Sequence, residues 1–189
     1  MTSDFASCAR ALATVATIAV HTRLIRVVPA LDLGRRVPPN FLFTSGRPNR
    51  FNPAGVECVY FAEDEATAVA EYLSRWRGTR AENQPRTTYC ADVTLRRVLD
   101  LTDRQVVSHM GLAAADLCAP WRGASTPTAT QVLGQAVAHQ YRVSAIRYPS
   151  VSTGRAASGT NIVVYRDSVR APDQLRILGP TRRALQHWP

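Results

Sequence analysis

The sequence predicts a single α+β domain with a mixed β-sheet core flanked by helices. Its 189 residues suffice for one well-buried domain and are few for two. Segments with strand character alternate with helical segments, and some strand connections are short, which favours a mixed sheet over a purely parallel one. The chain contains neither a glycine-rich phosphate loop nor a Rossmann fingerprint.

The first half of the chain predicts two helices and two strands. Leu12, Val15 and Ala19 recur at helical spacing. Further on, Asp64 is a suitable helix N-cap and Gly78 a suitable C-terminal stop. In order, we expect a helix over 4–20, a strand over 24–28, a loop over 32–53, a strand over 56–61 and a helix from Asp64 to about Arg77.

The second half of the chain predicts the remaining strands of the sheet and two further helices, followed by a short tail. In order, we expect a strand over 87–95 with 98–101 extending or pairing beside it, a helix over 103–110, a loop over 120–127, a helix over 128–141, strands over 143–148 and 161–165 around a Ser/Gly/Thr-rich loop at 150–160, and a tail with a strand over 175–178 and a short helix.

Every basic residue of the chain that is not histidine is an arginine, and the formal net charge is +9. A GC-rich genome that favours arginine codons explains this composition. Selection for phosphate binding explains it too, because a guanidinium binds phosphate bidentately and an ammonium does not. A basic surface suits nucleic acid, a phosphorylated small molecule or an acidic protein. The arginines are scattered without interleaved aromatic residues, which counts against single-stranded nucleic acid.

The cysteines and histidines predict no metal site. Cys8, Cys58, Cys90 and Cys118 lie about thirty or more residues apart, and no Cys/His pair has metal-ligand spacing, so we expect reduced, structural thiols. The apolar run over 11–20 is too short to span a bilayer and lacks a basic leader. We therefore expect a soluble, cytoplasmic protein that does not contact a membrane.

Between Ser45 and Glu71, an arginine-bearing loop, a strand and a capped helix follow one another. Arg50 lies in a Pro/Asn-rich loop with stiff flanks, Tyr60 near the end of the strand and Glu71 on the helix. These short elements place a cation, an aromatic ring and a carboxylate where they could line one pocket. Such a trio suits an anionic substrate in which positive charge develops during the reaction.

Each of these residues also has an explanation without a site. Arg50 could pack its stem on Phe51 at the surface, and Tyr60 could be ordinary core. Glu71 could pair with Arg75 in solvent, because it falls roughly opposite an apolar helix face. That face consists of Ala66, Val69, Ala70, Leu73 and Trp76.

Three further polar residues are candidates. Arg26 interrupts an apolar strand, so it must face water, a carboxylate or a polar cavity. Thr128 opens a helix whose N-terminus would suit a phosphate, although ordinary capping accounts for it equally well. Ser150 follows a Tyr-Pro pair and could simply start a turn.

The order of these motifs resembles the RES-domain family, the toxin half of many bacterial toxin–antitoxin pairs. The resemblance covers roughly residues 20–168 and departs from the family pattern at two loop glycines, which are Pro48 and Asn49 here. It implies one RES-like domain over 1–189, with its core at about 20–168, a helix within 1–19 and an extension at 169–189. The motifs that carry it are RLIRV, RPNRFNPAGVECVYFAEDEATAVAEY, YPSV and GTNIVVY.

This resemblance implies a fold similar to the ADP-ribosyltransferase toxins and an enzyme that degrades NAD. NAD would be the substrate, no bound cofactor or metal is expected, and inorganic phosphate or water would accept the ADP-ribosyl group. Carried over by motif, Glu71, Arg50 and Tyr60 take catalytic roles. The dinucleotide would be bound by Arg26, Arg50 and Tyr60, with Thr128 or Ser150 at the family's serine position.

The resemblance also implies a cognate antitoxin, which we expect to be acidic, with nucleic acid bound only through the antitoxin complex. Three other functions stay compatible with the sequence. The first is a protein ADP-ribosyltransferase that uses NAD. The second is a basic nucleic-acid-binding or nuclease toxin, whose binding would fall steeply with salt. The third is a non-catalytic module that holds an acidic partner.

Overall fold

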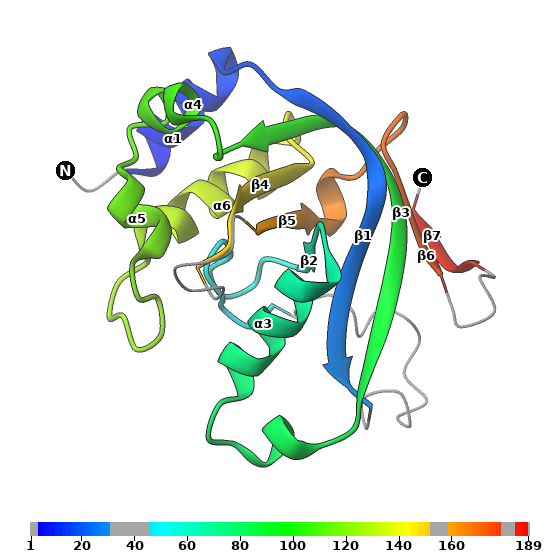
Figure 1. The fold of residues 1–189 in the computed structure, drawn as a ribbon. Coiled ribbons are helices and arrows are strands. Elements are labelled where there is room, and N and C mark those ends of the chain that lie inside the picture. Colours follow the sequence, from blue (N-terminus) through cyan, green and yellow to red (C-terminus); the bar gives the residue numbers. More distant parts are fainter. Residues whose placement is uncertain (1–3, 31–45, 152–158, 179–183, 189) are drawn as a thin grey trace.

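The strands of this chain form one sheet that curves back on itself. The computed structural model describes residues 4–30, 46–151, 159–178 and 184–188 (Figure 1). The helices are α1 (Phe5–Thr14), α3 (Glu65–Trp76), α4 (Arg104–His109), α5 (Ala114–Cys118) and α6 (Ala129–Gln140), with short 3-10 turns at Arg80–Asn83 and Arg166–Ser168. The strands are β1 (Ile18–Pro29), β2 (Cys58–Ala62), β3 (Arg86–Asp100), β4 (Ala145–Pro149), β5 (Thr160–Tyr165), β6 (Gln174–Leu178) and β7 (Ala184–Trp188).

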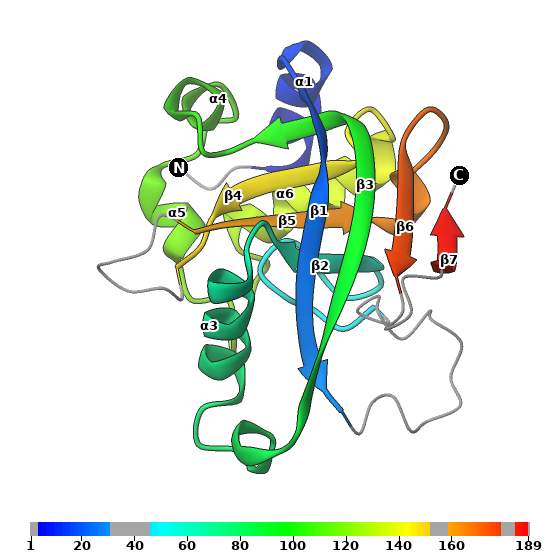
Figure 2. The same ribbon diagram turned by 45° about the vertical axis from the view of Figure 1, so that its right-hand side comes forward.

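Within the described residues, the strands pair in the order β1-β2-β5-β4-β3-β6-β7, and β1 also pairs with β3. That extra pairing closes β1, β2, β5, β4 and β3 into a ring. Strands β3 and β4 are parallel, whereas the other pairs are antiparallel. The α+β class and the mixed sheet are therefore confirmed. Figure 2 shows β1 and β3 crossing in front of β4 and β5, with β6 beside β3, so the curved sheet has two layers.

Two hydrophobic cores lie on opposite faces of the layer formed by β2, β5 and β4. Side chains alternate along each strand, so Val59 and Phe61 of β2 enter the core between the strand layers, and Cys58 enters the core beneath the helices. Helices α1, α4, α5 and α6 cover that second core, while α3 lies against β1 and β2 (Figure 1). The helices contribute Leu12, Val107, Leu117, Leu133 and Val137 to it.

The N-terminal helix ends earlier than predicted. Helix α1 stops at Thr14, and its C-cap Val15 is already extended, with ψ of 140°. From Ile18 onward the chain pairs with β3. The prediction of a helix over 4–20 is therefore wrong beyond Thr14, because pairing of the β-branched residues Ile18 and Val20 with a neighbouring strand overrides the helical spacing.

The C-terminal tail also differs from the prediction. The strand over 175–178 is confirmed as β6, but residues 184–188 form β7, antiparallel to β6, where the sequence predicts a short helix. Helix α5 lies in a stretch for which the sequence predicts no element. The other predicted helices and strands are present with shifted ends, while 31–45 and 152–158, parts of the predicted loops, lie outside the described residues.

Within the described ranges, no helix combines the length and apolar character that crossing a membrane requires.

An ion pair between half-buried Arg97 and buried Asp173 ties β3 to the start of β6 and the end of α6. The carboxylate of Asp173 is fully buried and accepts from the backbone N–H of Arg96 (2.6 Å) and from Nη2 and Nε of Arg97 (2.8 and 3.1 Å). Arg97 also donates to the backbone carbonyls of Tyr141 (2.6 Å) and Ser168 (3.0 Å). Removing one member of such a pair leaves the other charge uncompensated.

We predict that Asp173→Ala lowers the free energy of unfolding by about 3 kcal/mol, because Arg97 loses its buried partner. The exposed pair Arg23–Asp92 is the matched control, since 51% and 43% of its side chains are accessible. Asp92→Ala should cost less than about 1 kcal/mol. Urea denaturation of both variants measures the difference, and equal losses would contradict the assignment.

Candidate functional site

A single cavity brings four of the predicted site residues together. It has a volume of about 400 Å³ and lies beside α3, next to the point where β1 pairs with β2. Its wall includes Arg26 from β1, Arg50 from the loop that precedes β2, Tyr60 from β2 and Glu71 from α3. Residues 120–122, which follow α5, form another part of the wall.

Glu71 is held in a fixed orientation at this wall. The hydroxyl of Ser150, after the end of β4, donates to its Oε1 at 2.5 Å. The side-chain amide of Asn161, on β5, donates to the same oxygen at 2.7 Å. These two donors, one directly after β4 and one on β5, therefore fix the orientation of the Glu71 carboxylate on α3, which borders the cavity. The alternative of a solvated glutamate on an outer helix face does not describe this structure.

Helix α3 buries a different face from the predicted one. Its buried residues are Thr67, Ala68 and Tyr72, whereas Leu73 of the predicted face is 36% exposed. Glu71 lies next to Tyr72 and Ala68 along the cavity wall. The apolar periodicity misleads here because the inward face borders a polar cavity, so it carries small and polar side chains instead of a continuous apolar stripe.

A glycine allows α3 to approach β5 closely. A Cβ on Gly159 would overlap Oγ1 of Thr67, so any side chain there would push the helix away. The Thr67 hydroxyl itself donates to the N-cap Asp64 (2.6 Å), which fixes the start of α3. Because Glu71 lies one turn after Thr67, and Asn161 two residues after Gly159, this contact brings Glu71 within reach of its amide donor.

Arg26 points inward from β1. It shares a strand face with Leu24 and Val28, which are both buried. Its Nη1 donates to the backbone carbonyl of Tyr60 on β2 at 2.9 Å. The structure therefore places this guanidinium in the cavity wall between the two strands, and an exposed strand face does not account for it.

The guanidinium of Arg50 is anchored to the end of α5. Its Nη1 donates to the backbone carbonyls of Leu117 (2.8 Å) and Ala119 (3.0 Å). Carbonyls at the last turn of a helix lack intrahelical partners, so a cation satisfies them well. One end of Arg50 is thus fixed to the protein while the residue lines the cavity.

The loop that presents Arg50 is held by Tyr60 and Asn52. The Tyr60 hydroxyl donates to Oδ1 of Asn52 (2.8 Å) and accepts from the backbone N–H of Phe51 (3.0 Å). The amide of Asn52, a fully buried residue, donates to the carbonyls of Arg47 (2.8 Å) and Val56 (3.1 Å). Burial raises the pKa of the Tyr60 phenol well above its usual value, so it stays a neutral donor.

Helix α6 supports the same loop from below. A Cβ on Gly134 would overlap the carbonyl oxygen of Phe51, and that oxygen accepts from the hydroxyl of Tyr165 at 2.7 Å. The loop backbone therefore rests directly on the helix backbone. Only a glycine permits this approach.

Thr128 is the N-cap of α6 and does not line the cavity. Its hydroxyl accepts from the backbone N–H of Gln131, and the side-chain Oε1 of Gln131 accepts from the Thr128 N–H, which completes a capping box. Gln131 also donates to the carbonyl of Asn49, next to Arg50 (3.0 Å). Of the two candidates for the serine position, Ser150 contacts Glu71, and Thr128 reaches the site through Gln131.

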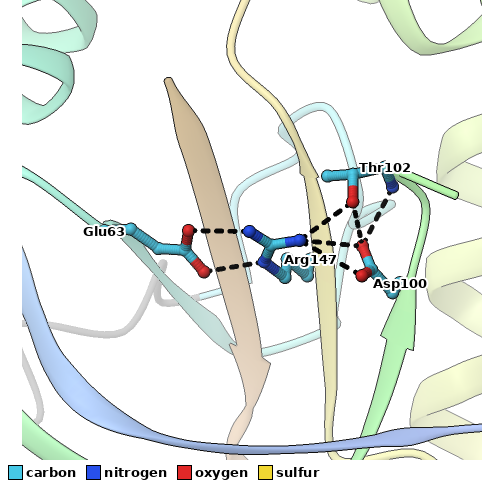
Figure 3. A network of polar contacts seen from close by, with 4 residues as sticks. All are labelled: Glu63, Asp100, Thr102 and Arg147. Atoms are coloured by element: carbon cyan, nitrogen blue, oxygen red, sulfur yellow. Dashed lines mark hydrogen bonds and ion pairs between the residues drawn. The ribbon is translucent and has the colours of Figure 1, made fainter. Parts of the chain in front are cut away.

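A network of polar contacts around Arg147 braces β4, the strand that Ser150 directly follows (Figure 3). Arg147 on β4 donates to both carboxylate oxygens of Glu63 (2.7 and 2.9 Å), which follows β2. It also donates to Asp100 at the end of β3 (3.1 Å) and to Thr102 (2.9 Å). The bidentate pair raises the pKa of Arg147, which keeps it charged. This ion pair joins Glu63, the residue before the α3 N-cap, to β4, the strand that Ser150 follows.

The cavity wall is strongly cationic. Among the described residues that line it, Arg26, Arg50, Arg75 and Arg122 are basic and Glu71 is acidic. Such an excess favours an anion, and the carboxylate adds one point where developing positive charge is stabilised. Aromatic rings offer stacking surfaces beside these charges, namely Tyr60, Tyr72, Trp76, Trp121 and Tyr148.

Tyr148 contributes a neutral phenol to the wall. Its pKa is raised well above the usual value, first by burial and then by the negative charge of Glu71, while Arg50 and Arg26 oppose the shift. Its ring also packs on Phe51, with centroids 4.4 Å apart.

Several residues of this site have no place in the sequence-based prediction. Asn161 and Asn52 are buried polar residues, and the amide of Asn161 opens an otherwise apolar strand. A buried polar side chain needs a partner, so this interruption was the available signal. Among the described residues, no group of three His, Cys, Asp or Glu side chains is arranged to hold a metal ion.

The RES domain family model matches residues 24–187. This chain belongs to the RES-domain family. The matched segment contains Arg26, Arg50, Tyr60 and Glu71 of the cavity wall, together with Ser150, which donates to Glu71. No curated protein matches the sequence.

Seven chains of solved structures match this RES-domain fold. One is a chain from the crystal structure of the M. tuberculosis MbcT–MbcA toxin–antitoxin complex, with a TM-score of 0.64, 21% sequence identity and coverage of 93% of each chain. At this identity the likeness shows a shared fold.

We predict that Gly134→Ala destabilises the protein by about 2 kcal/mol, because the methyl group displaces the loop at Phe51. The expected sign opposes helix propensity, which favours alanine over glycine by about 1 kcal/mol in a helix interior. Thermal unfolding measures the change. A variant as stable as the wild type, or more stable, would show that the loop does not rest on α6.

Proposed function

We propose that this RES-domain protein is the NAD-degrading toxin of a toxin–antitoxin pair and cleaves the nicotinamide–ribose bond of NAD. The observation that carries the proposal is the orientation of Glu71 by Ser150 and Asn161 in a cavity that also holds Arg26 and Arg50. Membership of the RES-domain family supports it. The structural match to a chain of a toxin–antitoxin complex supports the biological setting.

The cleaved bond joins the anomeric carbon of the ribose to the pyridinium nitrogen of nicotinamide. As it breaks, its electron pair goes to the nitrogen and neutral nicotinamide leaves, while the ribose gains oxocarbenium character. The Glu71 carboxylate would stabilise that positive charge. Because the charge exists mainly at the transition state, this interaction lowers the barrier more than it strengthens substrate binding.

The arginines would hold the anionic part of the substrate. Arg26 and Arg50 are each anchored by backbone carbonyls, so their positions are set before the dinucleotide binds. Charge-assisted hydrogen bonds from such groups to a pyrophosphate contribute about 1.5–3 kcal/mol each. Tyr60 and Tyr148 would contact the nicotinamide or the ribose through their rings, since the Tyr60 hydroxyl is engaged by the loop.

The second substrate supplies an oxygen atom to the anomeric carbon. If inorganic phosphate is the acceptor, its oxygen bonds to that carbon and ADP-ribose 1″-phosphate forms. With water, the same step yields free ADP-ribose and releases a proton. Transfer to a side chain of another protein would follow the same bond changes. The cationic cavity wall favours an anionic acceptor, so we propose phosphate first.

The cognate antitoxin would be an acidic protein. The formal net charge of +9 supports an acidic partner through long-range attraction. In this role nucleic acid would be contacted only through the antitoxin, and the toxin would act in the cytoplasm on cellular NAD.

We predict that Glu71→Gln lowers NAD turnover by about 10²-fold or more, because the variant keeps the shape of the side chain and loses its charge. Glu65→Gln, on an exposed position of the same helix, is the control and should leave turnover unchanged. Product identification by mass spectrometry, with phosphate, without phosphate, and with cell lysate proteins, separates the three acceptors. A Glu71→Gln protein that consumes NAD at the wild-type rate would eliminate the assignment.

We predict that Arg26→Ala weakens NAD binding roughly 10- to 100-fold, the loss of one charge-assisted bond to the pyrophosphate. Arg23→Ala, three residues earlier on β1 and paired with Asp92 at the surface, is the control. Isothermal titration calorimetry on both variants measures the affinities. Equal affinities for wild type and Arg26→Ala would remove the pyrophosphate role.

A further inference from the structure

The hydroxyl of Tyr148 is a polar group of the cavity wall that the described part of the protein leaves unsatisfied. Tyr148 lines the cavity and is only 6% exposed. Within the described residues its hydroxyl makes no hydrogen bond, and it is not sealed from solvent. Buried polar side-chain groups are in large majority paired. We therefore expect a ligand in the cavity to supply the partner of this hydroxyl.

Two other tyrosines of the same core show the usual arrangement. The hydroxyl of Tyr60 donates to Asn52 and accepts from the backbone N–H of Phe51. The hydroxyl of Tyr165 donates to the carbonyl of Phe51. Both phenols thus serve the loop before β2, whereas the hydroxyl of Tyr148 contributes nothing to that loop.

Strand pairing places Tyr148 beside the groups that orient Glu71. It lies directly opposite Asn161 in the antiparallel pair of β4 and β5, so the two side chains are neighbours on one face of the sheet. Ser150 follows Tyr148 by two residues. Asn161 and Ser150 are the two donors to the Glu71 carboxylate. The phenol therefore lies next to the catalytic end of the proposed site.

The same phenol also lies close to the arginines. Its ring packs on Phe51, which directly follows Arg50, with centroids 4.4 Å apart. Burial raises the pKa of the phenol, and the charge of Glu71 raises it further, whereas Arg50 and Arg26 oppose the rise. Tyr148 is thus within electrostatic range of the carboxylate and of both guanidiniums. It stays protonated, so its hydroxyl can donate and accept.

The order of groups in the dinucleotide matches this order of residues. In the proposed function the anomeric carbon faces Glu71, and the pyrophosphate lies on Arg26 and Arg50. The nicotinamide ribose joins these two parts of the substrate and carries hydroxyl groups at C2″ and C3″. A phenol between the carboxylate and the guanidiniums therefore meets the sugar, whose hydroxyl groups are suitable partners for it.

We propose that the Tyr148 hydroxyl forms a hydrogen bond with a hydroxyl group of the nicotinamide ribose and thereby selects for a ribose at this position. This inference rests on the proposed function. It adds the residue that recognises the sugar, in addition to any contact of the aromatic ring. A dinucleotide that lacks the sugar hydroxyl leaves the phenol unpaired in the closed complex, which is the kind of loss that makes a polar site discriminate.

The test uses Tyr148→Phe, which removes the hydroxyl and keeps the ring that packs on Phe51. We expect kcat/KM for NAD to fall about 3- to 10-fold, the net effect of one neutral hydrogen bond. Two NAD analogues, which lack the 2″- or the 3″-hydroxyl of the nicotinamide ribose, are measured in the same assay. With at least one of them, wild type and Tyr148→Phe should have equal kcat/KM, because the contact is already absent.

Two further variants serve as controls. Tyr141→Phe changes a tyrosine that is 40% exposed and outside the cavity wall, and it should leave every kcat/KM unchanged. Tyr165→Phe loses the bond to the Phe51 carbonyl and should lower the Tm. Tyr148→Phe should not lower the Tm, since its hydroxyl has no partner among the described residues. A lowered Tm would show a partner in the free protein and overturn the premise.

The outcomes separate this inference from the proposed function. If Tyr148→Phe turns over NAD like the wild type, or loses the same factor with NAD and with both analogues, recognition of the ribose is overturned and NAD cleavage stands. If the wild type does not consume NAD, the proposed reaction fails. Calorimetry with NAD and the analogues then decides the binding claim, which equal affinities of wild type and Tyr148→Phe for NAD, or no binding at all, would overturn.

Discussion

The Glu71 carboxylate and its two hydrogen-bond donors are the interaction on which the site depends. Without fixed hydrogen-bond donors, a carboxylate on a wall lined by several arginines could form an ion pair with one of them and turn away from a bound substrate. Donation from Ser150 (2.5 Å) and Asn161 (2.7 Å) to one oxygen fixes its direction. Ser150 directly follows β4 and Asn161 lies on β5, so the position of this helix residue is set by two segments that lie far from it in sequence.

The rest of the fold maintains this geometry through close backbone contacts and polar bracing. Gly159 lets α3 approach β5, and Gly134 lets the Arg50 loop rest on α6. Arg147 joins the segment before α3 to β4, the strand that Ser150 directly follows. Similarly, Tyr60 shapes the Arg50 loop through its hydroxyl. The scaffold therefore prearranges charge before any ligand is present, the condition under which electrostatic stabilisation is most effective.

Local chemistry predicted those elements whose ends carry their own signals. Asp64 and Thr128 cap α3 and α6 as their residue types indicate. The periodicity of apolar residues gave a wrong secondary structure where pairing with a strand distant in sequence determines the conformation. Residues 18–20 and 184–188 form strands because β3 and β6 pair with them. The predicted buried face of α3 is wrong for another reason, because a helix that borders a polar cavity has no continuous apolar stripe on its inward face. The motif order indicated the site, whereas the role of Asn161 required the three-dimensional arrangement.

The most direct measurement is a crystal structure of the Glu71→Gln variant with NAD bound, since removing the charge should slow cleavage and retain the substrate. The pyrophosphate should lie on the guanidiniums of Arg26 and Arg50, and the anomeric carbon of the nicotinamide ribose should face residue 71. A dinucleotide bound outside this cavity, or one whose nicotinamide ribose points away from residue 71, would contradict this arrangement.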